Sequence, residues 1–239
     1  SQRRTPRTPL TGTTAEAVAR FRASRAASFA ASAGRGRAAV VGKSLVGAND
    51  RLELLTSIDD LDLSGGEAGA GGIIPLLPAL DALERGYARS AIMSHGGLFD
   101  VGWDTHSTID QQTSNYEVLF EDLMSLMEEL DARSGTNGGS LADETTVVVI
   151  SEMGRAPSLN ATGGKDHWTF TSAMFIGAGV AGGRQIGGYD DNLLGRPVDL
   201  TSGEVSDSGT IPGTEHIGAT ILALADVEPE GSPISAVLA

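Results

Sequence analysis

The sequence contains no cysteine and only four histidines. Without cysteine, the chain can form no disulfide bond, no zinc–thiolate site and no thiol nucleophile. A metal site must therefore be built from Asp, Glu, His or backbone oxygen. Long apolar runs are also missing: none reaches the ~18 residues typical of a transmembrane helix, so we expect no membrane span.

Positive charge is scarce outside the first part of the chain. Residues 1–43 hold nine Lys and Arg against one acidic residue, whereas residues 44–239 hold eight against 30. The acidity of this larger part argues against a nucleic-acid partner, because it repels the phosphate backbone. Two interpretations of the basic stretch stay open: a helix lying on an acidic body, or a segment that docks an acidic partner such as nucleic acid or anionic lipid.

Composition along the chain predicts two parts. Residues 1–72 are predicted to form a basic helical segment, with helices over 13–32 and 43–58 and a flexible glycine-rich loop over 63–72. Residues 73–239 are predicted to form the main α/β part. Because the chain begins at Ser1 and not at Met, we also expect it to continue a longer protein.

Helical and strand patterns alternate in the second part. Apolar periodicity predicts helices over 73–86, 114–135 and 215–227, strands over 88–97, 145–151 and 172–180, and a short hairpin within 185–200. The middle helix has an apolar stripe typical of a core, and Ser114 and Glu117 predict a capping box at its start. Because the strand "TTVVVIS" is apolar throughout, the pattern predicts a mostly parallel sheet flanked by helices.

Residues typical of metal ligands follow or precede the predicted strands. Asp104 and His106 come after the first strand, Glu152 directly after the second, and Asp166 and His167 before the third. Functional groups collect at strand ends of parallel sheets, so these loops are expected to meet. Carboxylates and imidazoles bind divalent ions, which makes the five residues candidate metal ligands.

Each of these motifs also has a plain structural interpretation. The D-x-H spacing fits a hydrogen bond within a turn, Glu152 fits a cap or a pair with Arg155, and Asp166-His167 fits a surface loop. Arg155 is equally compatible with binding an anionic substrate group.

Two other histidines and the two tryptophans complete the candidates. His216 is expected at a helix start, whereas His95 lies at the end of a predicted strand and is a weaker site candidate. Trp103 and Trp168 adjoin the two histidine motifs and are expected to form a wall of the site.

The motifs "GGLFDVGWDTHS", "TTVVVISEMGR" and "GGKDHW", in this order, resemble the bacterial DUF1501 family, a domain of unknown function within the alkaline phosphatase and sulfatase superfamily. The resemblance covers about residues 73–228. It implies an alkaline phosphatase-like fold and an exported protein, periplasmic or extracellular. It further implies a metal-dependent hydrolase of small sulfate or phosphate esters that uses divalent ions such as Zn, Ca, Mg or Mn.

The resemblance also assigns roles to residues. Asp104 and His106 match the first ligand pair of the superfamily, Glu152 the acid of a later pair, and His167 the final histidine. Met153 stands where the superfamily has a second histidine, for which Asp166 is a candidate substitute.

The first-strand aspartate and nucleophile of the superfamily have no counterpart in residues 1–70. We therefore expect the fold and the site to be incomplete at the N-terminus. The alternative is a non-catalytic exported binding or structural protein that reuses the fold with a degenerate or truncated site.

Overall fold

The computed structural model describes residues 20, 21, 24, 76–98 and 102–239. Internal contacts divide the chain into two units, Ser1–Leu63 and Ser64–Ala239, and almost all described residues belong to the second. Residues 20, 21 and 24 are helical. The rest of the helix predicted over 13–32, the helix over 43–58 and the loop over 63–72 lie outside the described residues.

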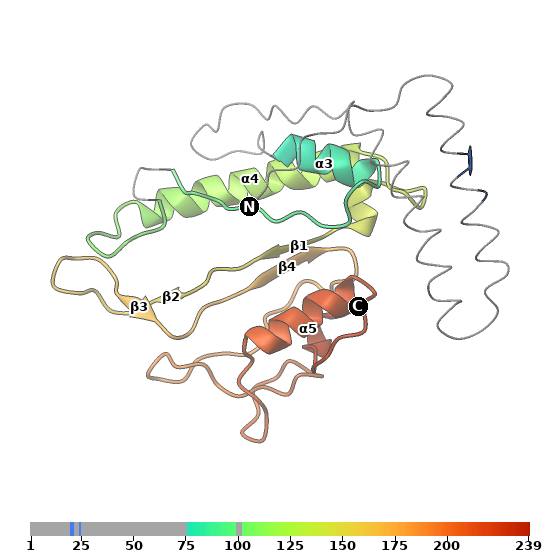
Figure 1. Cartoon of the computed structure of the whole chain (residues 1–239). Helices are drawn as coiled ribbons and strands as arrows, with labels where there is room; N and C mark the ends of the chain where they lie inside the picture. Colours follow the sequence, from blue (N-terminus) through green and yellow to red (C-terminus); the bar gives the residue numbers. More distant parts are fainter. Residues whose placement is uncertain (1–19, 22–23, 25–75, 99–101) are drawn as a thin grey trace, which may run out of the picture. The chain divides into compact units, whose positions relative to one another are not determined.

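The second unit contains three α-helices and four short strands among its described residues (Figure 1). In chain order, the elements are α3 (Leu77–Glu84), α4 (Gln112–Ala132), the 3-10 helix η3 (Leu141–Glu144), β1 (Thr146–Val149), β2 (Gly154–Arg155), β3 (His167–Trp168), β4 (Met174–Gly177), α5 (Thr214–Leu224) and the 3-10 helix η4 (Ser235–Val237). The three predicted helices and the predicted strands over 145–151 and 172–180 are therefore confirmed. The hairpin predicted within 185–200 corresponds to an isolated antiparallel bridge between Tyr189 and Gly195.

The predicted parallel sheet is wrong. The described strands form two separate two-stranded sheets, β1–β4 and β2–β3, and both are antiparallel. In Figure 1 the chain runs out through β1 and β2, turns, and returns through β3 and β4. A chain that doubles back on itself pairs its two arms in opposite directions, which gives an antiparallel ladder.

The apolar run of β1 is explained by burial on both faces and does not require a parallel sheet. Val147 contacts a core of Leu80, Leu130 and Leu141, from α3, α4 and η3. Phe175, which pairs with Val148 on the other face, contacts a second core around Ile234 and Val237. Both faces of the β1–β4 pair are therefore covered, and an apolar run reports this burial without reporting strand direction.

Two further predictions are wrong, one for the segment before α4 and one for the start of α4. Residues 88–97 form no strand with the described chain, and Ile92 is 98% exposed. The capping box is also wrong: the N-cap is Gln111 and no side chain caps the helix, so Ser114 lies inside the first turn.

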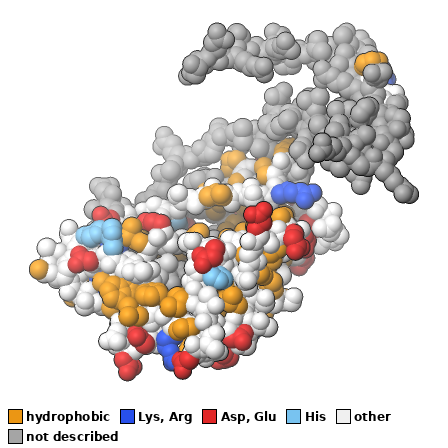
Figure 2. All heavy atoms as spheres, turned by 60° about the horizontal axis from the view of Figure 1, so that its bottom comes forward, with side chains coloured by type: hydrophobic (Ala, Val, Ile, Leu, Met, Phe, Trp, Pro, Cys, Tyr) orange, Lys and Arg blue, Asp and Glu red, His pale blue; other side chains and the backbone are white. Residues whose placement is uncertain are grey.

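The apolar stripe of α4 is buried over only part of its length. Leu126, Met127 and Leu130 pack in the first core, whereas Tyr116 and Phe120 are about half exposed. None of the described helices is both long and apolar enough to cross a membrane. On the face that Figure 2 shows, acidic side chains are spread over the described residues with few basic ones among them.

Candidate functional site

The β2–β3 pair forms a platform that sets two of the candidate residues side by side. Arg155 lies opposite His167 in the antiparallel register, and Gly154 lies opposite Trp168. Residues directly opposite in such a pair have neighbouring side chains on one face. Gly154 allows this close pairing, because a Cβ there would lie 1.7 Å from the backbone oxygen of Phe170.

The loop that carries Asp104 and His106 lies directly against the loop that leads into β3. The backbone N–H of Lys165 donates to the carbonyl of Thr105 over 2.8 Å. A Cβ at Gly164 would lie only 2.0 Å from the backbone oxygen of His106. The absence of a side chain at residue 164 is therefore what lets the two loops touch.

This contact brings two histidines together from distant parts of the sequence. The ring centroids of His106 and His167 are 4.5 Å apart, with the ring planes inclined by 56°. Asp104 joins them, because its Oδ1 contacts Nδ1 of His106 and accepts the backbone N–H of His106 over 3.2 Å. The predicted turn hydrogen bond of the D-x-H motif is thus confirmed, and Asp104, His106 and His167 share one location.

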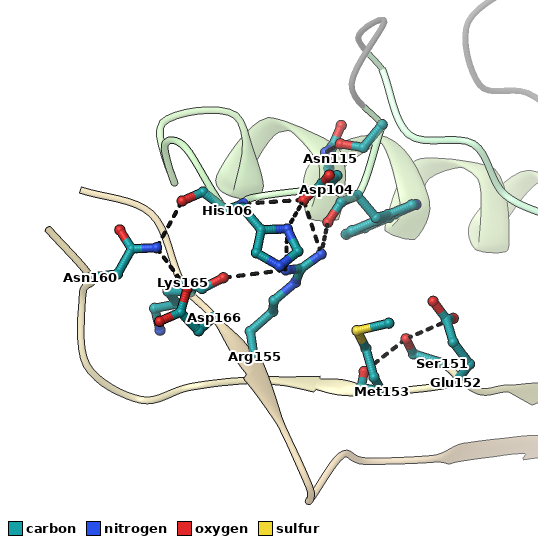
Figure 3. Close-up of polar contacts among 12 residues, drawn as sticks. Asp104, His106, Asn115, Ser151, Glu152, Met153, Arg155, Asn160, Lys165 and Asp166 are labelled. Atoms are coloured by element: carbon teal, nitrogen blue, oxygen red, sulfur yellow. Dashed lines mark hydrogen bonds and ion pairs between the residues drawn. The ribbon is translucent and has the colours of Figure 1, made fainter. Parts of the chain in front are cut away.

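Arg155 ties the two loops to each other (Figure 3). Its Nη1 lies 3.1 Å from Nδ1 and 3.3 Å from Nε2 of His106, and donates to the carbonyl of Lys165 over 3.2 Å. Its Nη2 reaches the carbonyl of Trp103 at 3.3 Å and Asp104 Oδ1 at 3.4 Å. Arg155 therefore pairs with Asp104 and not with Glu152, and most of its donors are used within the protein.

Asn160 is a site residue that the sequence reasoning missed. Its Nδ2 donates to the carbonyl of His106 and to Asp166 Oδ1, both over 2.9 Å. Its Oδ1 accepts the backbone N–H groups of Thr162 and Gly164, both over 3.0 Å. An Asn followed by a glycine-rich turn is the available signal, because Asn side chains organise such turns.

Glu152 lies apart from the histidines. Its contact among the described residues is the hydroxyl of Ser151, at 3.4 Å, while that hydroxyl also donates to the carbonyl of Met153 over 3.0 Å. Figure 3 shows Ser151, Glu152 and Met153 grouped away from the Arg155 cluster. Asp166 is held by Asn160, so the structure does not place it beside Glu152 as a substitute ligand.

The remaining histidines have structural partners. His95 Nε2 lies 3.1 Å from Asp122 of α4, and its Nδ1 faces the indole N–H of Trp103 at 3.3 Å. His216 accepts the backbone N–H of Gly213 over 3.0 Å, which confirms its predicted place at a helix start.

The two tryptophans turn to different partners. The indole N–H of Trp103 donates to the backbone carbonyl of His95 over 2.9 Å, and that of Trp168 to the carbonyl of Leu193 over 3.2 Å. Neither indole has a ring contact with His106 or His167 among the described residues.

The electrostatics of the cluster favour an ionised Asp104. The side-chain hydrogen bond from His106 lowers the pKa of Asp104 below its ordinary value of 3.8. The backbone N–H of His106 and the charge of Arg155 act in the same direction. Within the part of the chain that the structure describes, no three His, Asp or Glu side chains are already arranged around one metal position.

A family described as "Protein of unknown function (DUF1501)" matches residues 76–200, more than half of the chain and all of the cluster. The chain belongs to the DUF1501 family. Neither a curated protein nor a solved structure matches this chain. Within this DUF1501 chain, the matched region includes both loops, β2, β3 and Asn160.

Proposed function

We propose that this DUF1501 protein is a metal-dependent hydrolase of small phosphate or sulfate esters. The observation that carries the proposal is the meeting of His106 and His167, with ring centroids 4.5 Å apart, beside the carboxylate of Asp104. The proposed relationship to alkaline phosphatases and sulfatases, and with it export from the cell, rests on the three sequence motifs alone.

The donor groups suit a divalent ion in their chemistry. Two imidazoles and a neighbouring carboxylate are ligands of zinc and manganese, whereas calcium and magnesium prefer sites made of oxygen. Arg155 opposes binding, because its guanidinium group lies against His106. The donor chemistry therefore suits a divalent ion, which would need ligands besides His106 and His167, because no three such side chains of the described residues already surround one position.

The chemical roles follow from this arrangement. A divalent ion would polarise an ester oxygen and favour attack on the phosphorus or sulfur atom. His106 and His167 would hold the ion, and Arg155 would keep the two loops in place through its contacts with Trp103 and Lys165. Ser151 lies outside the cluster, so we assign it no role as nucleophile.

The contacts of Arg155 and the position of Glu152 favour a second candidate function. Arg155 contacts four residues of the cluster, and Glu152 is remote from it. In this alternative the protein is a non-catalytic exported binding or structural protein, and the cluster only joins two loops.

Metal analysis of the whole chain separates the two candidates. The protein is purified without chelators, its metal content is measured by mass spectrometry, and Zn²⁺ and Mn²⁺ are titrated by calorimetry. The hydrolase proposal expects bound metal and turnover of nitrophenyl phosphate or nitrophenyl sulfate. His106→Ala and His167→Ala should each weaken metal binding by more than the ~10–100-fold that loss of an outer partner causes.

His216→Asn is the matched control, because asparagine retains an acceptor at the start of α5 and the residue lies outside the cluster. It should leave metal affinity unchanged. A chain that binds neither ion and hydrolyses neither ester contradicts the proposal and supports the non-catalytic alternative.

A further inference from the structure

The contact between Asp104 and His106 favours one tautomer of the imidazole. One oxygen, Oδ1 of Asp104, meets both the backbone N–H and the ring Nδ1 of His106. An ionised carboxylate only accepts hydrogen bonds, so Nδ1 must carry the hydrogen in this contact. In the neutral imidazole, Nε2 is then the nitrogen with a free lone pair.

Arg155 does not compete for that lone pair. Its Nη1 is almost equally far from the two ring nitrogens, at 3.1 and 3.3 Å. A donor on the lone pair of one ring nitrogen would be much farther from the other nitrogen. Nη1 of Arg155 therefore lies along the lone pair of neither ring nitrogen.

We propose that Asp104 is a positioning residue, which holds His106 as the Nδ1–H tautomer and leaves Nε2 as its metal-binding atom. This inference rests on the proposed metal site. It assigns which residues bind the ion directly, the inner ligands, and which residue supports them from outside, the outer support. A carboxylate that accepts the second N–H of a ligating histidine fixes the ring and raises its basicity. His106 and His167 are then the inner ligands, and Asp104 is their outer support.

This assignment differs from the one that the motif resemblance implies, in which Asp104 is itself a ligand. The two roles need different chemical groups at residue 104. An outer support needs an acceptor oxygen, which Asn also provides, whereas an inner ligand needs the charged carboxylate. The side chain of Asp104 is 62% exposed, so substitutions there do not disturb the core.

The first experiment reads the tautomer directly in the metal-free full-length chain. Long-range ¹H–¹⁵N NMR spectra of histidine-labelled protein at about pH 8.5, where an ordinary imidazole is neutral, distinguish Nδ1–H from Nε2–H. His106→Gln assigns the signal. We expect Nδ1–H at His106 in the native chain and in Asp104→Asn, and loss of this preference in Asp104→Ala.

The second experiment measures Zn²⁺ affinity of the same variants by calorimetry. We expect Asp104→Asn to bind within about tenfold of the native chain, and Asp104→Ala to lose about 10–100-fold. Asp110→Asn is the control for removal of a nearby charge, because the exposed side chain of Asp110 makes no hydrogen bond or ion pair with the described residues. This variant should leave the affinity unchanged.

The outcomes separate this inference from the function on which it rests. An Nε2–H signal for His106, or an Asp104→Asn affinity as low as that of His106→Ala, overturns the positioning role. If the native chain binds no metal at all, the proposed function fails, whereas the tautomer of the metal-free chain still decides whether Asp104 positions the ring.

Discussion

Asn160 donates a hydrogen bond to the backbone carbonyl of His106 over 2.9 Å, across 54 residues of sequence. The second hydrogen of the same amide binds Asp166 Oδ1, also over 2.9 Å. One side chain thus connects the D-x-H turn to the segment that enters β3. The spacing of the two histidine motifs depends on this amide as much as on the histidines.

We expect Asn160→Asp to separate the two loops. The substitution replaces the donating nitrogen by an oxygen that faces the carbonyl of His106 and the carboxylate of Asp166, so two hydrogen bonds become repulsive contacts. The free energy of unfolding, measured in urea, should fall by about 1–3 kcal/mol.

Gln185→Glu is the control for Asn160→Asp. It makes the same chemical change at an exposed side chain without a hydrogen bond in the described part of the chain. Equal losses of stability in the two variants would contradict the role of Asn160.

Gly164 and Gly163 should respond differently to alanine. A Cβ at Gly164 would lie 2.0 Å from the His106 carbonyl, whereas a Cβ at Gly163 meets no atom within 4 Å. Gly163→Ala should cost only about 1–2 kcal/mol, because its φ of +80° disfavours a side chain. Gly164→Ala should cost more and expose the Lys165 amide, which hydrogen exchange measures. Protection of that amide in Gly164→Ala would show that the loops tolerate the added methyl group.

The sequence predicted the described helices because their apolar residues recur with helical periodicity over two or more turns. The prediction of strand direction was wrong, because an apolar run such as Val147–Val149 indicates only that both faces of the strand are buried. The strand prediction also failed over 88–97, where Ile92 is apolar yet exposed. Which faces are covered depends on contacts that local patterns do not contain.

The motifs identified Asp104, His106 and His167, and the structure places these three together. The binding partners of Arg155 and the role of Asn160 were not predictable in the same way. Both depend on the contact between the loops at Gly164, which no spacing within one motif reveals. Glu152 was included because of its strand-end position, but the turn after β1 leaves it beside Ser151.

A third prediction on stability concerns the connection between α3 and α4. Arg133 is 15% exposed and donates to Asp81 over 2.6 Å and to Glu84 over 3.0 Å. A double-mutant cycle with Arg133→Met and Asp81→Asn should give a coupling energy of about 1 kcal/mol in urea unfolding, reduced by salt.

Arg196 and Asp207 provide the matched exposed pair. Their atoms are 3.6 Å apart, and the side chains are 45% and 99% exposed. The same cycle with Arg196→Met and Asp207→Asn should give a coupling near zero. Similar couplings for the two pairs would show that partial burial of Arg133 does not strengthen its ion pair.

The hydrogen bonds that Glu144 accepts from the loop after α4 should make stability depend on pH. Glu144 accepts the hydroxyl of Thr136 over 2.6 Å and the backbone N–H groups of Thr136 and Asn137. The hydroxyl of Thr136 is the main cause that lowers the pKa of Glu144 below its ordinary value of 4.5, followed by the N–H of Asn137. These donors stabilise the charged carboxylate in the folded chain more than in the unfolded chain.

A carboxyl group whose pKa is lower in the folded state stabilises the fold fully above its unfolded pKa, here near 4.5, and this contribution is lost as the pH falls through the folded value. Glu144→Gln should therefore destabilise the chain most at neutral pH, and its difference from the native chain should shrink below pH 4.5. Urea unfolding at pH 7 and at pH 3 measures both differences.

Glu128→Gln on α4 removes an exposed carboxylate that accepts no hydrogen bond from the described residues, so it controls for the charge alone. A Glu144→Gln difference that stays constant or grows in acid would contradict the stabilising role of the Thr136 and Asn137 donors.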